Sequence, residues 1–271
     1  MGIHQATLSS GLTRSRKARV GTDVLCECVY RPLAHLVVLA LLPLRVPPPA
    51  VVLAAGATGI AGAVELARGH LVVAALLVQL KTVLDNADGQ LARLSDRVTL
   101  LGRYLDSECD LVVDAALFAG LGWYAHAPVA ALGGFVALTA VLSVNFNVER
   151  LYRGAALSVP EAHGLTGALQ RVYALCYGWQ DRLVERLVES RLRGASDEAR
   201  AAYHDRLTVG VLANLGMTPQ LAAFGVCIAV GHPLAFVWVL AGELVLVAAL
   251  VMRRETLRDG VVLQGQPGGI T

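Results

Sequence analysis

The chain has 271 residues, of which 55% are hydrophobic and only 16% are charged, and its mean hydropathy is +0.57. This composition excludes an ordinary soluble globular domain and indicates a polytopic, all-α membrane protein. The net charge of +2 is too small to indicate a partner such as nucleic acid. The positions of the Lys and Arg residues are therefore more informative than their number.

Two N-terminal segments are expected to precede the membrane-spanning part. Residues 1–23 are polar and basic and lack the apolar core of a signal peptide, so we interpret them as a basic cytoplasmic tail. Residues 24–46 predict a juxtamembrane amphipathic helix on the membrane surface. Their apolar stretch, 33–44, is shorter than the roughly 20 residues that a spanning helix needs.

Six apolar stretches then have the length of a membrane span, and together they predict a six-helix transmembrane catalytic domain over 47–252. The long connection 147–206 has an amphipathic pattern and is expected to lie at the cytoplasmic interface. Residues 253–271 are expected to form a cytoplasmic C-terminal tail. The predicted spans are 50–67, 70–92, 98–122, 127–146, 207–230 and 233–252.

The distribution of positive charge predicts the orientation of these spans. If the N-terminus is cytoplasmic, 22 of the 23 Lys and Arg residues lie on the cytoplasmic side and only Arg68 lies outside. Positive side chains near span ends are retained in the cytoplasm, so both termini are expected there. Residues 81–110 then lie at the cytoplasmic edge of spans two and three of an integral cell-membrane protein.

Residues 85–110 read DNADGQLARLSDRVTLLGRYLDSECD and concentrate carboxylates at this edge. Asp85 and Asp88 are three residues apart and Asp106 and Asp110 are four apart, so each pair lies on one helix face. If spans two and three are antiparallel neighbours, the four carboxylates share one small volume. Two charges 4 Å apart repel by about 4 kcal/mol at an effective dielectric near 20, so protonation or bound cations must relieve this crowding.

Oxygen-only ligands favour hard divalent cations, and two Mg²⁺ ions would balance four carboxylates and could hold a diphosphate. Small residues at Gly89, Ala92 and Gly102 leave space for a nucleotide or a neighbouring helix, and Arg93 can pair with a phosphate oxygen.

A simpler interpretation is that the motif carboxylates pair with Lys81, Arg97 and Arg103 at the membrane surface. Such pairs contribute little to stability and explain neither the spacing nor the glycines.

Asp114 lies one turn beyond Asp110, and we favour a structural or supporting role for it. Glu243 is costly in lipid, so we expect it to face the bundle interior, where packing is favoured over catalysis.

The pattern D-x2-D-G-x2-A-R-x8-G-x3-D-x3-D resembles the signature of the CDP-alcohol phosphotransferases, and the chain matches all eight fixed positions. That family also has a surface helix followed by six spans, with the motif across spans two and three. The resemblance weakens before span one, where many members have a Thr-Pro-Asn-like turn and this chain has Pro47, Pro48 and Pro49.

The resemblance implies roles for individual residues. Asp110 would be the general base. Arg150 and Arg153, which end span four, would hold a phosphate of the acceptor, although they could equally extend to lipid headgroups. Two Mg²⁺ ions would bind, and Mn²⁺ could substitute for them. The first would bind to Asp85, Asp88 and Asp106, and the second to Asp85, Asp106 and Asp110. The CDP group would contact Gly89, Ala92, Arg93 and Gly102.

The implied reaction is attack by an alcohol hydroxyl on the phosphorus of a CDP-linked donor, with release of CMP, in phospholipid biosynthesis. CDP-diacylglycerol is the favoured donor, and the acceptor is a small polar alcohol, including phosphorylated ones such as inositol phosphate or glycerol phosphate. The resemblance also suggests a homodimer embedded in membrane lipid. One alternative is the same chemistry with a soluble CDP-alcohol donor and a lipid or soluble acceptor.

Two further alternatives come from other classes. Intramembrane acids also mark ion paths, so a cation- or proton-coupled transporter is one alternative, but the acids here cluster once and near one face. A non-catalytic scaffold would be indicated by loss of a motif aspartate, and none is missing.

Overall fold

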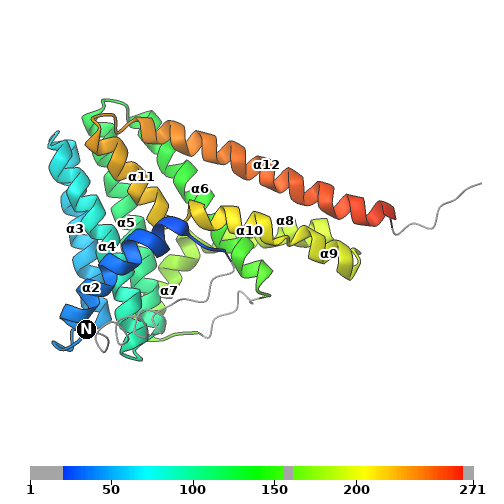
Figure 1. Ribbon diagram of the computed structural model, residues 1–271, viewed down its shortest axis with the longest axis horizontal. Coiled ribbons are helices and arrows are strands. Elements are labelled where there is room, and N and C mark those ends of the chain that lie inside the picture. Colours follow the sequence, from blue (N-terminus) through cyan, green and yellow to red (C-terminus); the bar gives the residue numbers. More distant parts are fainter. Residues whose placement is uncertain (1–20, 155–160, 265–271) are drawn as a thin grey trace, which may run out of the picture.

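The computed structural model describes residues 21–154 and 161–264, and within these ranges it contains helices and turns but no strand. The predicted all-α fold is therefore confirmed (Figure 1). The elements are η1 (Cys26–Tyr30), α2 (Arg31–Leu41), α3 (Pro48–Ala67), α4 (Leu71–Leu94), α5 (Leu100–Tyr124), α6 (Pro128–Tyr152), α7 (Gly164–Cys176), α8 (Gly178–Leu192), α9 (Asp197–Tyr203), α10 (Arg206–Leu212), η2 (Ala213–Leu215), α11 (Met217–Ala229) and α12 (Ala235–Gln264).

Helices α3, α4 and α5 stand side by side, and α3 packs along both of the others (Figure 1). Glycine permits the close approach of α3 and α5. A Cβ atom at Gly120 of α5 would lie 2.5 Å from the backbone carbonyl oxygen of Ala63 in α3. At Gly59 of α3, a Cβ atom would lie 2.5 Å from a methyl group of Val113 in α5. Small residues thus set the spacing of the helices that bear the motif.

We expect Gly120→Ala to destabilise the protein, because the new methyl group meets backbone atoms that cannot rotate away. Overpacking of this kind costs roughly 1–3 kcal/mol. Gly133→Ala on α6 is the matched control, because a Cβ atom there meets no atom within 4 Å. Thermal unfolding of both variants in detergent measures the difference. Equal melting temperatures would contradict the close contact between α3 and α5.

An aromatic cluster joins α5 to the C-terminal helices. The ring of Phe224 in α11 stacks on Phe236 of α12 with centroids 4.7 Å apart, and on Phe118 of α5 at 5.7 Å. Leu66 and Leu121 are fully buried in the same cluster. The core of the bundle therefore lies at the end of α5 opposite to the motif.

The length and apolar character of the helices support an integral membrane protein, but they do not confirm six spans. Three described helices meet both criteria: Pro48–Ala67, Pro128–Tyr152 and Ala235–Val262. A fourth span results if Asp197–Leu215 and Met217–Ala229, which are inclined by 43°, act as one bent element. Helices α4 and α5 have 24 and 25 residues, but the charges of the motif lie within them.

The predicted surface helix over 24–46 corresponds to a shorter helical segment, η1 followed by α2. One face of α2 buries Ala34 and Val38 against α3 and α4, while Leu36 and Leu39 on the other side are exposed. The Gln90 side chain of α4 also donates a hydrogen bond to the backbone carbonyl of Arg31, at 3.1 Å. The segment is thus part of the packed fold, and its amphipathic character and membrane-surface position are not confirmed.

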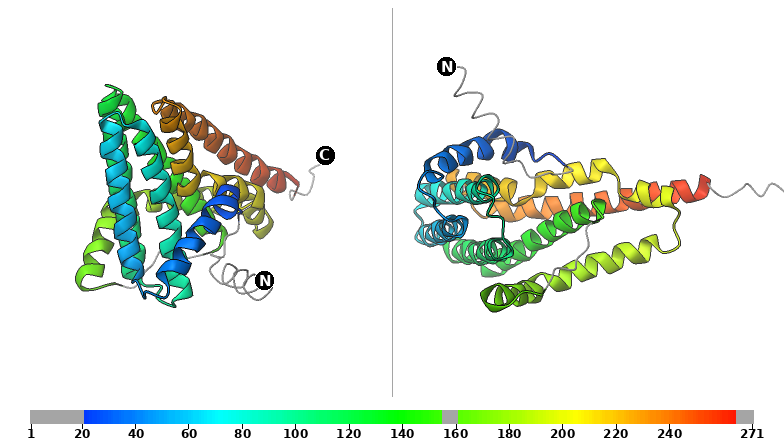
Figure 2. Two further views of the ribbon diagram at one scale, coloured as in Figure 1. Left: turned by 60° about the vertical axis from the view of Figure 1, so that its left-hand side comes forward. Right: turned by 90° about the horizontal axis from the view of Figure 1, so that it is seen from below.

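Helix α12 continues to Gln264, beyond the predicted end of span six at 252, and runs outward along α9 (Figures 1 and 2). The guanidinium of Arg254 explains this extension. It is buried, its Nε donates to the backbone carbonyl of Tyr203 at 2.7 Å, and it lies 4.1 Å from the centroid of the Tyr203 ring. These contacts attach the extended end of α12 to α9.

Candidate active site

The two halves of the motif lie on α4 and α5, which are joined by a short turn. Asp96 in this turn has a φ of 53°, in the left-handed region that Asp tolerates better than most residues. The hydroxyl of Thr99 then accepts a hydrogen bond from the Gly102 backbone N–H at 3.0 Å and caps the start of α5. The chain thereby reverses direction, and the carboxylates of α4 come to face those of α5.

Three of the four motif carboxylates converge. Asp85, Asp88 and Asp106 each offer an oxygen atom, and these atoms lie within 4.8 Å of one another. Asp88 is buried, and its Oδ2 has no hydrogen-bond partner among the residues that the structure describes. A set of oxygen donors that includes an unsatisfied buried oxygen fits a hard divalent cation such as Mg²⁺.

The fourth carboxylate, Asp110, is held by Lys81 of α4. The Lys81 ammonium lies 2.9 Å from Oδ1 of Asp85 and also donates to Oδ1 of Asp110. Only 2% of the Lys81 side chain is exposed. The sequence offered a pairing of Lys81 with motif carboxylates as a surface interaction, whereas the structure places this pairing in the protein interior.

A cavity of about 450 Å³ opens beside the carboxylates, between the start of α3 and the facing parts of α4 and α5. Its volume is within the range of small-molecule sites. Asp88 and Asp106 form one part of its wall, and Arg97 and Arg103 add positive charge. The lining also includes the four residues that the family resemblance assigned to the CDP group: Gly89, Ala92, Arg93 and Gly102.

The glycines of this cavity have a steric role. A Cβ atom at Gly89 would lie 3.2 Å from Nη1 of Arg93, so glycine leaves room for the guanidinium. A Cβ atom at Gly102 would meet only the Thr99 hydroxyl within 4 Å, also at 3.2 Å, so a longer side chain there would extend into the cavity. The sequence did not predict that Thr99, Pro48 and Val52 would line this cavity.

The two arginines predicted to bind the acceptor lie at the end of α6, and neither is among the described residues that line this cavity. Arg150 is buried, and its Nη1 lies 3.4 Å from a carboxylate oxygen of Glu185 in α8. Arg153 donates to Glu149 at 2.5 Å. The Arg150 contact attaches α8 to α6, whereas the Arg153 contact stays within the end of α6. Acceptor binding by either arginine stays a prediction.

A polar network connects the same region to α7. Asp181 of α8 accepts hydrogen bonds from Asn147 at 2.7 Å and from the Tyr173 hydroxyl at 3.3 Å. Burial and the neighbouring Asp181 carboxylate raise the pKa of the Tyr173 phenol, so it stays protonated and can donate. The Tyr173 ring also packs against Tyr104 of α5, with centroids 5.6 Å apart. Helix α7 is thereby fixed next to the motif helix α5, and α8 is joined to α6 and α7.

Asp114 and Glu243 lie where the sequence suggested interior positions. Asp114 is buried one turn beyond Asp110 on α5. Glu243 of α12 is half-buried and accepts a hydrogen bond from Gln220 of α11 at 2.5 Å. The Glu243 contact joins two helices and supports a packing role.

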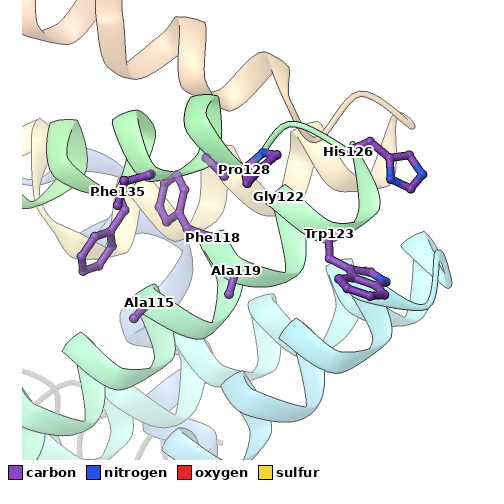
Figure 3. A pocket seen from close by; sticks show the side chains of 10 residues that line it. Ala115, Phe118, Ala119, Gly122, Trp123, His126, Pro128 and Phe135 are labelled. Atoms are coloured by element: carbon purple, nitrogen blue, oxygen red, sulfur yellow. The ribbon is translucent and has the colours of Figure 1, made fainter.

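A larger cavity of about 690 Å³ lies between α5 and α6, beside the apolar core and away from the motif (Figure 3). Figure 3 shows Trp123 and His126 near the turn and Phe118 and Phe135 further along the two helices. Among the described residues that line it, His126 alone has a titratable side chain. The described lining thus holds no group of reactive residues, so the smaller cavity beside the carboxylates is the candidate active site.

The motif lies within a region that matches a known protein family. A family model for CDP-alcohol phosphatidyltransferase matches residues 34–188, which is more than half of the chain and contains the complete motif. The chain therefore belongs to the CDP-alcohol phosphatidyltransferase family.

Several curated relatives share part of the sequence. The phosphatidylinositol phosphate synthase of Corynebacterium glutamicum is 33% identical over 99 residues, covering 36% of this chain and 43% of the relative. The enzyme of the same name from Mycolicibacterium smegmatis is 35% identical over 103 residues, covering 38% and 46%. The bifunctional IPC transferase and DIPP synthase of Thermococcus kodakarensis is 37% identical over 86 residues, covering 31% and 20%. The chain spans less than half of each relative, and no solved structure matches it.

Proposed function

We propose that the protein transfers a phosphatidyl group from CDP-diacylglycerol to a hydroxyl of inositol phosphate or a similar phosphorylated alcohol, releasing CMP. The observation that carries this proposal is the cavity in which Gly89, Ala92, Arg93 and Gly102 lie beside the motif carboxylates. The names of the relatives from Corynebacterium and Mycolicibacterium support the choice of donor and acceptor.

In this proposal Asp85, Asp88 and Asp106 hold Mg²⁺, for which Mn²⁺ can substitute. A bound divalent cation would neutralise phosphate charge and make the phosphorus more electrophilic. The family resemblance implies two such ions, whereas the described residues bring three carboxylates to one place and pair the fourth with Lys81.

Asp110 acts as the general base and removes the proton of the acceptor hydroxyl. The hydroxyl oxygen then forms a bond to the phosphorus that bears the diacylglycerol group, and the bond from this phosphorus to the CMP oxygen breaks. Arg93, which lines the cavity, pairs with a phosphate oxygen of the donor, and Lys81 holds the Asp110 carboxylate by donating to its Oδ1.

We further propose that the site lies at the cytoplasmic face of the cell membrane, with both termini in the cytoplasm. The distribution of Lys and Arg supports this orientation. In this arrangement α4 and α5 also cross the bilayer, with their charged residues clustered at one edge, which gives the six predicted spans. The homodimer implied by the family resemblance stays a prediction.

An assay of purified protein with Mg²⁺ tests the reaction. We expect CMP to be released from CDP-diacylglycerol only when a matching alcohol is present, with inositol phosphate and glycerol phosphate compared against unphosphorylated inositol. A parallel series with soluble CDP-alcohols distinguishes the alternative donor. CMP release without any acceptor would indicate a hydrolase, and no release from any CDP-linked donor would contradict the proposal.

A further inference from the structure

Lys81 is unusual among the basic residues of this chain. Of the 23 Lys and Arg residues in the sequence, only Lys17 and Lys81 are lysines. An ammonium is a compact point charge, whereas a guanidinium is a planar fork that needs more room. A lysine is therefore the residue that can fit between two closely spaced carboxylates inside the bundle.

The surroundings of Lys81 fix its position. The side chain is 2% exposed, and a Cβ atom at Gly59 of α3 would lie 3.2 Å from Lys81 Cγ. The absence of a side chain at Gly59 thus leaves room for the lysine stem. At its end, the ammonium contacts one oxygen of Asp85 and one oxygen of Asp110.

These contacts bear on the number of cations at the site. A second cation shared by Asp85, Asp106 and Asp110 would have to bind two carboxylates to which the ammonium already donates, through Oδ1 of Asp85 and Oδ1 of Asp110. Mg²⁺ lies about 2.0–2.1 Å from its ligands, so such an ion and the ammonium would compete for the same small volume and would repel each other. The three carboxylates that converge without Asp110 can still accept one ion.

We propose that the Lys81 ammonium takes the place of a second divalent cation, so that the centre binds one cation on Asp85, Asp88 and Asp106 while Lys81 holds Asp85 and Asp110. This inference rests on the proposed function, since it assumes that a divalent cation binds to the three carboxylates. Lys81 is then a positioning residue: it supplies fixed positive charge and orients the general base.

Binding of Mn²⁺ to the full-length protein in detergent tests this inference, with the bound metal counted per chain and its electron paramagnetic resonance spectrum recorded. We expect one Mn²⁺ per chain, with the spectrum of an isolated ion. Lys81→Met keeps a long side chain but removes the ammonium, so the bound Mn²⁺ should double, and two ions about 3.5–4 Å apart should give an exchange-coupled spectrum. Lys17→Met, the same substitution at the other lysine, should still bind one isolated ion.

The outcomes separate this inference from the proposed function. Two coupled ions in the unmodified protein would overturn the inference and leave the proposed transferase mechanism intact. No bound Mn²⁺ would overturn both. One ion in the unmodified protein and still one in a folded Lys81→Met variant would show that the lysine does not occupy a cation site. If that variant does not fold, the count and spectrum of the unmodified protein decide.

Discussion

Asp110→Asn is expected to abolish turnover while leaving binding of the CDP-linked donor measurable. The amide has nearly the shape of the carboxylate and can still accept a hydrogen bond from Lys81, but it cannot take a proton from the acceptor hydroxyl. Loss of a general base lowers rates by about 10²–10⁴-fold. CMP release measures the rate, and calorimetric titration with the donor measures binding.

Asp96→Asn is the matched control, because Asp96 is exposed in the turn between α4 and α5 and Asn tolerates its positive φ. This variant should keep the turnover of the unmodified protein. A fully active Asp110→Asn variant would rule out Asp110 as the base. Loss of donor binding as well as turnover would instead indicate that Asp110 contributes to the donor site.

The motif could be predicted from the sequence because its spacing is helical. Carboxylates three or four residues apart must share a helix face, and the short turn after Leu94 brings the second helix back toward the first. The small and basic residues between the pairs then line the same cavity. Local periodicity and one turn were therefore sufficient to predict that these residues come together.

The role of Lys81 was harder to predict from the sequence, although its spacing from Asp85 indicates one of its two contacts. Lys81 lies four residues before Asp85, a spacing at which side chains on a helix interact. Its contact with Asp110 and its burial against Gly59 depend on how α3 and α5 pack. Sequence periodicity gives the face of a helix, but not which charge on that face is enclosed by neighbouring helices.

The count of membrane spans shows a related limit. The sequence predicted membrane spans over 70–92 and 98–122 because their apolar stretches are long. The corresponding helices α4 and α5 do not meet the combined criteria of length, hydropathy and charge for a membrane span. The predicted single span over 207–230 is divided into α10, η2 and α11, with a bend of 43° between the two parts.

Removal of divalent cations with a chelator is expected to abolish turnover, and added Mg²⁺ should restore it. Asp85, Asp88 and Asp106 lie too close together to be compensated by Lys81 alone, and the donor would bring phosphate charge to the same place. Each pair of unit charges 4 Å apart repels by about 4 kcal/mol at an effective dielectric near 20. Without a divalent cation, this repulsion between the carboxylates and the donor phosphates would prevent the donor from binding. CMP release with and without chelator measures the effect.

Asp88→Asn makes this prediction specific to the proposed ligands. The variant keeps an oxygen at the position of the unsatisfied Asp88 atom but removes one negative charge, so we expect half-maximal activity to need a higher Mg²⁺ concentration. Asp96→Asn again serves as the control and should leave the Mg²⁺ dependence unchanged. Full turnover in excess chelator would exclude a required divalent cation, and the convergence of the carboxylates would then need protonation as its explanation.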